Sequence, residues 1–325
     1  MFKKIAIRNI PSQIFQALEI LANRHDRSTE AEARQALRAW VEPLSVQDSR
    51  NSRCKAVAAR LNLMLTQVNA GQQGRDLAPS HIAEAIKEER AGEVEDWFLG
   101  EKEPSFAQLE AIASFLGVNS EWLKHGDKTL YPPEYHRLSE NPFEAVDWLL
   151  TWNDTTDAPS DGTVKTLYLI RADNDTGELY IVKESDKSHF RTFYTPIHVS
   201  EAIGAGGEAS LAALFVTLEL LYKRYTKMGS DIMVLGYQLK PNDIKQLTGG
   251  NTHPGALLKE ASRSMWWEDL WDRKMAPNHN YFPGWQSLYE CIDRVISGKA
   301  SLNKIRTQIR QGETVTMPQE EVQHV

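Results

Sequence analysis

The first 43 residues predict one strand followed by two helices, a combination that a single chain cannot complete as a fold. From Lys3 to Asn9 the side chains alternate between two faces, which is the period of a half-buried strand. Pro11 and Ser12 then begin an amphipathic helix that ends in the polar run 23–26. The apolar stripe of this helix consists of Ile14, Phe15, Leu18, Leu21 and Ala22.

A second helix is predicted after Ser28 and Thr29, whose hydroxyl groups can cap its amino end. Glu32 lies three residues after Thr29, where a capping-box partner is expected. We expect this helix to stop at Pro43, because proline lacks the N–H that a helix interior needs. The residues predicted to face inward are Ala33, Ala36, Leu37 and Trp40.

A lone strand leaves both of its edges unpaired, and one short helix pair cannot cover its own apolar face. The simplest completion is a homodimer in which two strands pair antiparallel and the helices interlock. Such a ribbon fits the major groove of double-stranded DNA. The outward side chains Lys4, Ala6 and Arg8 are therefore candidates for contacting bases. Arg8 can offer two donors to a guanine edge, whereas Lys4 is better suited to a phosphate.

Three further residues are candidates for contacting DNA phosphates, namely Lys3, Ser28 and Thr29. The last two stand at a helix amino terminus, where free backbone N–H groups attract anions. The alternative is a strand-swapped dimerisation module that does not touch DNA.

The segments IAIRNIP and HDRSTEAEARQALRAW resemble the ribbon-helix-helix repressors of the Arc/MetJ class, most closely the FitA-like antitoxins. The resemblance covers about residues 2–42. It implies that the outward strand residues read bases and that the cap of the second helix grips the DNA backbone. Ala6 is smaller than the polar residue often found at this position, which leaves one base contact apolar.

A linker is expected over 44–53 (LSVQDSRNSR), which is polar and shows no periodicity. Residues 53–69 then predict an amphipathic helix, and four shorter helical patterns follow at 79–86, 92–100, 105–118 and 119–126. Ser105 is the expected cap of the third short helix, and Gly117 and Gly126 are expected to end the last two.

Residues 55–126 resemble Cro/C1-type (Xre-like) helix-turn-helix domains in core and turn positions. The shared features are Ile82-Ala83, Val94, Trp97, Gly100, Pro104-Ser105, Ile112-Ala113, Leu116-Gly117-Val118 and Trp122-Leu123. The positions that would face DNA depart from the family, since Ala78 and Pro79 replace the usual cap and phosphate-binding glutamine. The expected recognition helix exposes carboxylates that DNA would repel, namely Glu93, Glu95 and Asp96. Two alternatives remain open for this region. One is a second DNA-binding surface with Arg75, Arg90 and Lys102 as its cations, and the other is a helix bundle used for dimerisation or partner contact.

The last large segment, 135–312, predicts an α+β domain with a mostly antiparallel sheet and helices on one face. Strands are expected at 163–171, 178–183, 190–198 and 231–239, a strong helix at 211–225, and further helices at 255–272 and 284–310. A second linker is expected over 128–142, and 313–325 is expected to be a flexible tail. This domain resembles no family that we can name. The predicted domains are therefore 1–45, 50–127 and 135–312.

Catalytic or metal-binding patterns are not evident in the sequence. The histidines at 189, 198, 253 and 279 lack metal-ligand spacing, and the expected roles are exposed or capping residues. Cys291 is expected to be a small core residue, and Gly204–Gly207 a flexible turn rather than a phosphate site. An aromatic cluster can line an effector pocket, anchor an interface or simply fill the core; its tryptophans are Trp266, Trp267, Trp271 and Trp285.

The net charge of −7 hides an asymmetry, because residues 1–45 carry seven basic and five acidic side chains. Two cysteines exclude a disulfide scaffold and suit a reducing cytoplasm, and no apolar stretch is long enough to span a membrane. We therefore expect a cytoplasmic, homodimeric DNA-binding transcriptional regulator of bacterial, phage or plasmid origin, without cofactor and without enzymatic activity. The alternative is an antitoxin-like protein whose rear domain binds a protein partner and whose DNA binding is autoregulatory; a small-molecule ligand of that domain is also open.

Overall fold

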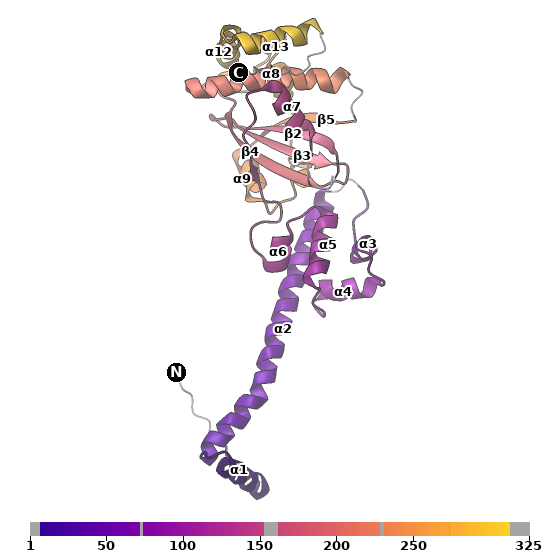
Figure 1. Cartoon of the computed structure of the whole chain (residues 1–325), viewed down its shortest axis with the longest axis vertical. Coiled ribbons are helices and arrows are strands. Elements are labelled where there is room, and N and C mark those ends of the chain that lie inside the picture. Colours follow the sequence, from indigo (N-terminus) through magenta and orange to yellow (C-terminus); the bar gives the residue numbers. More distant parts are fainter. Residues whose placement is uncertain (1–6, 72–73, 153–161, 228–230, 273, 313–325) are drawn as a thin grey trace, which may run out of the picture. The chain divides into compact units, whose positions relative to one another are not determined.

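A computed structural model of the chain describes residues 7–71, 74–152, 162–227, 231–272 and 274–312 (Figure 1). The chain divides into two compact units. The first comprises Met1–Ala59 with Glu95–Glu103, and the second comprises Arg60–Val94 with Pro104–Val325. Within the described residues, no helix is long and apolar enough to cross a bilayer.

Two helices follow the amino-terminal segment, α1 (Ser12–Arg24) and α2 (Thr29–Gly71). Both begin where the sequence predicts, but α2 does not stop at Pro43, and 44–53 is helical backbone rather than a linker. The expectation was wrong because one proline removes only one backbone donor. The residues after it include no glycine or second proline, so the remaining hydrogen bonds can propagate through a polar stretch that lacks an apolar stripe.

Four short helices follow α2: α3 (Pro79–Ala85), α4 (Ala91–Leu99), α5 (Phe106–Leu116) and α6 (Ser120–His125). Their positions confirm the four predicted patterns. Ser105 Oγ accepts from Gln108 N at 3.2 Å, and Ser105 N donates to Gln108 Oε1 at 2.7 Å, which completes a capping box. Gly117 (φ 65°) and Gly126 (φ 78°) end α5 and α6 in the left-handed conformation that glycine adopts without strain.

A five-stranded sheet forms the centre of the second unit, with strand order β1-β4-β3-β2-β5. Its strands are β1 (Glu134–Tyr135), β2 (Val164–Ala172), β3 (Glu178–Ser185), β4 (Phe190–His198) and β5 (Met233–Leu239). Both edges are limited: β1 has two residues, and Arg263 and Ser264 pair with the outer side of β5, Ser264 N donating to Gly236 O at 2.8 Å. The four longer strands confirm the predicted ones.

The sheet is mixed rather than mostly antiparallel. β2 and β3 pair antiparallel, as do β3 and β4, but β1 is parallel to β4 and β5 is parallel to β2. For β5 the cause is helix α8 (Ala205–Lys227), which connects β4 to β5. A helical crossover returns the chain to the end of the sheet from which it started, so the next strand runs parallel.

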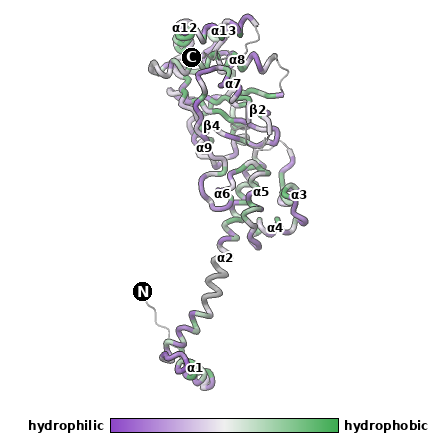
Figure 2. The backbone as a smooth tube through the Cα atoms, viewed as in Figure 1, coloured by the Kyte–Doolittle hydropathy of each residue, from purple (hydrophilic) through white to green (hydrophobic). Residues whose placement is uncertain are grey.

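Helices cover both faces of the sheet, not one face as expected (Figure 1). On one face lie α7 (Pro142–Leu150), α8, α12 (Trp285–Gly298) and α13 (Ala300–Gln311). On the other lie α9 (Pro241–Gly249) and α10 (Pro254–Glu260), whose Leu247 and Leu258 pack with Ile170 of β2. The adjacent residues Leu169 and Ile170 are both buried and belong to separate apolar clusters, so each face needs its own cover. Figure 2 shows hydrophobic stretches both in the sheet and in the helices around it.

Several predicted boundaries differ from the observed ones. The helix expected at 255–272 is divided into α10 and α11 (Trp266–Asp269), with an extended residue, Ala261 (ψ 150°), after α10. The helix expected at 284–310 is divided at Lys299 (ψ 102°) into α12 and α13, and a short 3-10 helix occupies Ala276–Asn278. Helix α7 was missed because Pro142 suggested a break, although proline is common in the first helical turn.

A buried lysine connects the sheet to the end of α7. The side chain of Lys183 on β3 is fully buried, and its Nζ donates to Trp148 O at 2.6 Å and to Thr151 O at 2.8 Å. The same Nζ lies 3.5 Å from the centroid of the Trp148 ring. These carbonyl groups belong to the carboxyl end of α7, where the helix dipole favours a positive charge. Lys183 therefore adds a charged donor at the end of α7, where Trp148 O also accepts from Thr151 N at 3.2 Å.

We expect the substitution Lys183→Met to lower the free energy of unfolding by about 2–3 kcal/mol, because two carbonyl groups at the end of α7 lose a buried charged donor. Urea unfolding followed by tryptophan fluorescence measures the change. Lys165→Met on the neighbouring strand is the control, because Lys165 is exposed and should change stability by less than about 0.5 kcal/mol. Equal effects of the two substitutions would contradict the role of Lys183.

His253 stands where the short helices meet the sheet, within the second unit. Its backbone N donates to Gln67 Oε1 of α2 at 3.0 Å, and its Nδ1 accepts from Ala256 N at 3.3 Å, which caps α10. The capping role confirms the sequence prediction for this histidine. Burial lowers the pKa of His253 to about 4, so the ring is neutral in the folded protein at neutral pH.

This lowered pKa predicts a loss of stability in mild acid. The unfolded chain binds a proton at His253 below about pH 6.5, whereas the folded chain does so only near pH 4. The stabilisation is therefore complete above pH 6.5 and decreases as the pH falls, by about 2 kcal/mol at pH 5. His253→Asn retains a capping oxygen but does not titrate, so its urea unfolding should show a smaller difference between pH 7 and pH 5. The same pH dependence in both proteins would refute this assignment.

Candidate nucleic-acid interface

The turn between α1 and α2 is held by local hydrogen bonds. Asp26 adopts a left-handed conformation (φ 53°), which aspartate tolerates better than most residues. Arg27 N donates to Ala22 O at 2.9 Å, and Ser28 Oγ accepts from Ala31 N at 3.2 Å. Ser28 is thus the cap of α2, as the sequence predicts, and the direction of the chain between the two helices is set within a few residues.

Glu32 is not the capping-box partner that the sequence suggests. The residue three positions after the cap is Ala31, so Glu32 lies one position too far to reach back to the cap. Its carboxylate is instead almost completely buried and faces the turn, with Oε1 2.9 Å from His25 Nδ1 and Oε2 3.7 Å from Arg27 Nη1. Glu32 therefore links the first turn of α2 to the residues that follow α1.

The apolar residues of this helix pair are largely uncovered in a single chain. Of the residues predicted to face inward, Ala22 is buried, whereas the side chain of Trp40 is 72% exposed. The other large apolar side chains exposed on α1 and on residues 29–40 of α2 are Ile14, Phe15, Ile20, Leu21 and Leu37. An exposed apolar surface of this kind is typical of an interface with another chain. The described part of the first unit therefore agrees with the argument that one copy is incomplete.

Arg8 lies in the segment before α1, which has no regular secondary structure, and is exposed. No strand is present in the described residues 7–11, and Asn9 has a left-handed conformation (φ 61°). The other strand candidates, Lys3, Lys4 and Ala6, lie outside the described residues. The proposed ribbon thus stays a prediction.

The two phosphate candidates on α2 differ in their environment. Ser28 is exposed and its Oγ is used by the cap, whereas Thr29 is the half-buried first residue of the helix. The exposed arginines of the first unit include Arg24, Arg27, Arg34 and Arg38.

Helix α4, the expected recognition helix, buries Val94, Trp97 and Phe98. Glu93 and Glu95 are exposed, and Asp96 Oδ2 lies 3.1 Å from Lys102 Nζ. One of the three candidate cations is thus already paired with a carboxylate of the same helix. Arg75 and Arg90 are exposed. At the start of α3 no side chain caps the helix from Ala78; His81 Nδ1 accepts from Ala78 N at 2.9 Å instead.

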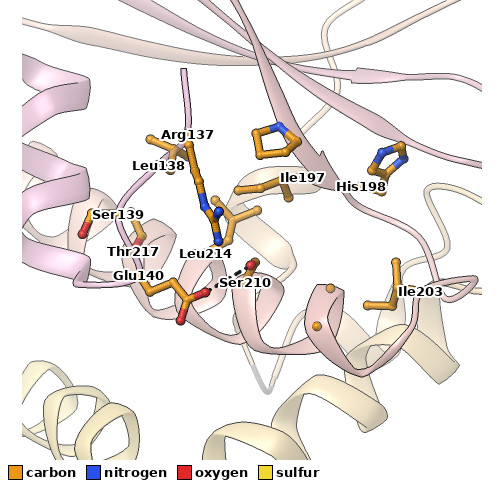
Figure 3. A pocket seen from close by; sticks show the side chains of 13 residues that line it. Arg137, Leu138, Ser139, Glu140, Ile197, His198, Ile203, Ser210, Leu214 and Thr217 are labelled. Carbon is orange, nitrogen blue, oxygen red and sulfur yellow. Dashed lines mark hydrogen bonds between the residues drawn. The ribbon is translucent and has the colours of Figure 1, made fainter. Parts of the chain in front are cut away.

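A cavity of about 240 Å³ lies beside the first turns of α8 (Figure 3). The glycines at 206 and 207 belong to α8 and line this cavity, so Gly204–Gly207 is a helix start rather than a flexible turn. Arg137 extends toward Ser210 and Glu140, and Ser210 Oγ donates to Glu140 Oε1 at 3.3 Å. A carboxylate therefore already occupies the polar side of this cavity.

The tryptophan cluster is mainly core. Trp266, Trp267 and Trp285 are fully buried, and Trp271 packs against the same cluster while half-buried. Trp266 Nε1 donates to Tyr237 O at 3.0 Å, and Trp285 Nε1 donates to Ala276 O at 2.8 Å. None of the four lines the cavity beside α8 or the larger cavity between the short helices and the sheet.

The histidines and the cysteine considered as catalytic or metal-binding candidates contact neighbouring groups of the fold. His189 Nε2 lies 3.0 Å from Phe115 O, and His279 Nε2 lies 3.7 Å from Asp269 Oδ2. Cys291 is half-buried, with Sγ 3.8 Å from Glu208 Oε1. A search of the described residues found no group of three or more potential metal ligands.

Comparison with known proteins supports one part of the chain. Residues 4–41 match the family model described as Antitoxin FitA-like, ribbon-helix-helix. The amino-terminal region is therefore similar to FitA-like ribbon-helix-helix antitoxins. This match confirms the resemblance inferred for that region, and it indicates a DNA-binding regulator of the antitoxin or repressor type. No curated protein and no solved structure matches the chain. The Xre-like resemblance and the role of the rear domain stay predictions.

We expect Glu32→Ala to loosen the turn between α1 and α2, because His25 and Arg27 lose their common acceptor. A loss of about 1 kcal/mol corresponds to roughly fivefold faster amide exchange across residues 21–33. Hydrogen exchange with mass spectrometry measures this locally. The control is Glu30→Ala, since Glu30 is exposed and its ion pair with the exposed Arg34 is 4.0 Å long. Unchanged exchange in Glu32→Ala would show that the contacts of Glu32 do not stabilise the turn.

Proposed function

We propose that the protein is a sequence-specific DNA-binding transcriptional regulator that acts as a homodimer through its amino-terminal region. The match of residues 4–41 to the ribbon-helix-helix family carries this proposal. Ribbon-helix-helix domains typically dimerise and bind DNA.

The apolar surface of α1 and α2 supports dimerisation. Burying one large apolar side chain contributes about 1.5–3 kcal/mol, and a twofold interface buries each residue twice. Trp40, Ile20 and Ile14 are each more than half exposed in the single chain, so they have most of this energy still to gain. A second copy of the same region supplies a complementary apolar surface.

The proposed DNA contacts follow from pairing two copies of 3–9. Lys4, Ala6 and Arg8 would face bases in the major groove, and Lys3, Ser28 and Thr29 would hold phosphates. Twofold symmetry in the protein favours an inverted-repeat operator. Residues 55–126, with Arg75 and Arg90, would extend the footprint or the assembly. The rear domain acts as a binding module in this proposal, and no catalytic step or cofactor is assigned to it.

A second candidate function is that of an antitoxin whose rear domain binds a protein partner. The description of the matched family favours it. In that case DNA binding serves autoregulation, and the partner should co-purify with the chain expressed from its native locus. A stand-alone regulator should purify without such a partner.

The DNA-binding proposal is tested at Arg8. An operator is first selected from a random duplex pool with the full chain, and affinity is then measured by gel shift at several salt concentrations. Arg8→Ala should weaken operator binding by about 30-fold or more, since the homodimer loses two bidentate base contacts that cost about 1–3 kcal/mol each. Non-specific DNA binding should change much less, and both should weaken steeply with salt.

The matched control is Lys304→Ala, an exposed cation on α13. It should leave operator affinity unchanged. Equal operator affinity for Arg8→Ala and Lys304→Ala would argue against the ribbon as the reading element, and failure to select any operator would argue against sequence-specific binding itself.

A further inference from the structure

A large cavity of about 790 Å³ lies in the second unit between the short helices and the sheet. One wall is the sheet face that also carries α9 and α10. In the strand register, Thr166 stands opposite Glu184 and Met233, whereas Ile170 stands opposite Tyr180 and Tyr237. The apolar cluster of α9 and α10 includes Ile170, so these helices cover the Ile170 end of the face. The Thr166 end is left to line the cavity.

The sheet side of the cavity is aromatic. Tyr168 of β2 lies between Phe190 of β4 and Tyr237 of β5, with ring centroids 6.5 Å and 6.1 Å away. His253 lies edge-on to Phe190 at 4.8 Å. All four rings line the cavity. Aromatic rings arranged in this way offer faces and edges against which a planar ring can pack.

The polar side chains Tyr168, Glu184 and His253 line the cavity, and their surroundings determine their protonation and contacts. Tyr168 Oη donates to Glu184 Oε2 at 2.7 Å, and burial together with Glu184 raises the pKa of Tyr168, so the hydroxyl stays protonated. The carboxylate of Glu184 is therefore engaged by a neighbour rather than by a cation. His253 is neutral at pH 7 for the reason given above.

Four cations surround this aromatic wall, and they come from separate parts of the chain. They are Lys165 on β2, Lys187 between β3 and β4, Lys259 on α10 and Arg263 after α10. All four are exposed, and none forms an ion pair with another described residue. With Glu184 as the carboxylate of the lining, the cavity has an excess of positive charge in a chain whose net charge is −7.

We propose that this cavity binds a small molecule that combines a planar aromatic ring with a phosphate or carboxylate group. The ring packs against Tyr168, Phe190 and Tyr237, and the anionic group is held by Arg263 and the three lysines. The volume lies within the range of about 300–1,000 Å³ that is typical of ligand sites, and such sites are common where two layers of a protein meet. Val68 of α2 and Phe115 of α5 line the opposite side, so the ligand contacts both the short helices and the sheet.

The test uses the full chain and two probes that share this chemistry, adenosine monophosphate and salicylate, in isothermal titration calorimetry. Binding of at least one is expected, and the stronger one identifies a nucleoside phosphate or an aromatic carboxylate as the source. Adenosine, which lacks the anion, and inorganic phosphate, which lacks the ring, should each bind at least about tenfold more weakly. The assay contains no DNA, so its outcome is independent of the proposed regulator function.

The double substitution Lys259→Glu/Arg263→Glu reverses two exposed charges and should weaken probe binding by about tenfold or more without unfolding the chain. Lys304→Glu on α13 is the matched charge reversal outside the cavity and should leave binding unchanged; circular dichroism verifies the fold of both variants. The proposal is overturned if neither probe binds, if the double variant binds as well as the control, or if inorganic phosphate alone binds as tightly as the probes.

Discussion

Strand β2 is the element on which the second unit depends, because it is hydrogen-bonded on both sides and packed on both faces. β3 and β5 satisfy its backbone, while Leu169 and Ile170 point into separate apolar clusters. A strand in this position cannot lose either layer without exposing a core face to water. The crossover helix α8, the cover by α9 and α10 and the buried Lys183 all follow from the need to enclose this one strand.

The first unit has the opposite problem, since its helix pair is well specified locally but poorly covered. The cap at Ser28 and the buried carboxylate of Glu32 determine how the chain turns between α1 and α2. Tertiary burial is then almost absent on the apolar side, as Trp40 shows. Local order without burial is what a subunit needs if its remaining stabilisation is to come from a copy of itself. In this view folding and DNA recognition use the same association.

Local sequence signals predict much of the secondary structure, whereas contacts between residues far apart in the chain cannot be predicted from them. Ser105 and Gly117 predict the two ends of α5. Helix caps depend on residues only three or four positions apart, so the sequence alone reveals them. Pro142 led to a wrong prediction, because a proline ends a helix in its interior but is common in its first turn. The parallel direction of β5 depends on α8 crossing the sheet. The alternating pattern around Tyr168 correctly predicts a strand. The local sequence does not show, however, that α9 and α10 leave the end of the sheet near Tyr168 uncovered.

The two edges of the sheet are short or occupied: β1 pairs through two residues, and Arg263 and Ser264 lie along β5. Backbone groups at such edges offer few free donors and acceptors to an incoming strand. At the β5 edge, a further copy of this chain therefore has little opportunity to extend the sheet. In the proposed homodimer, self-association uses the amino-terminal helices instead, and twofold symmetry closes that interface after two subunits.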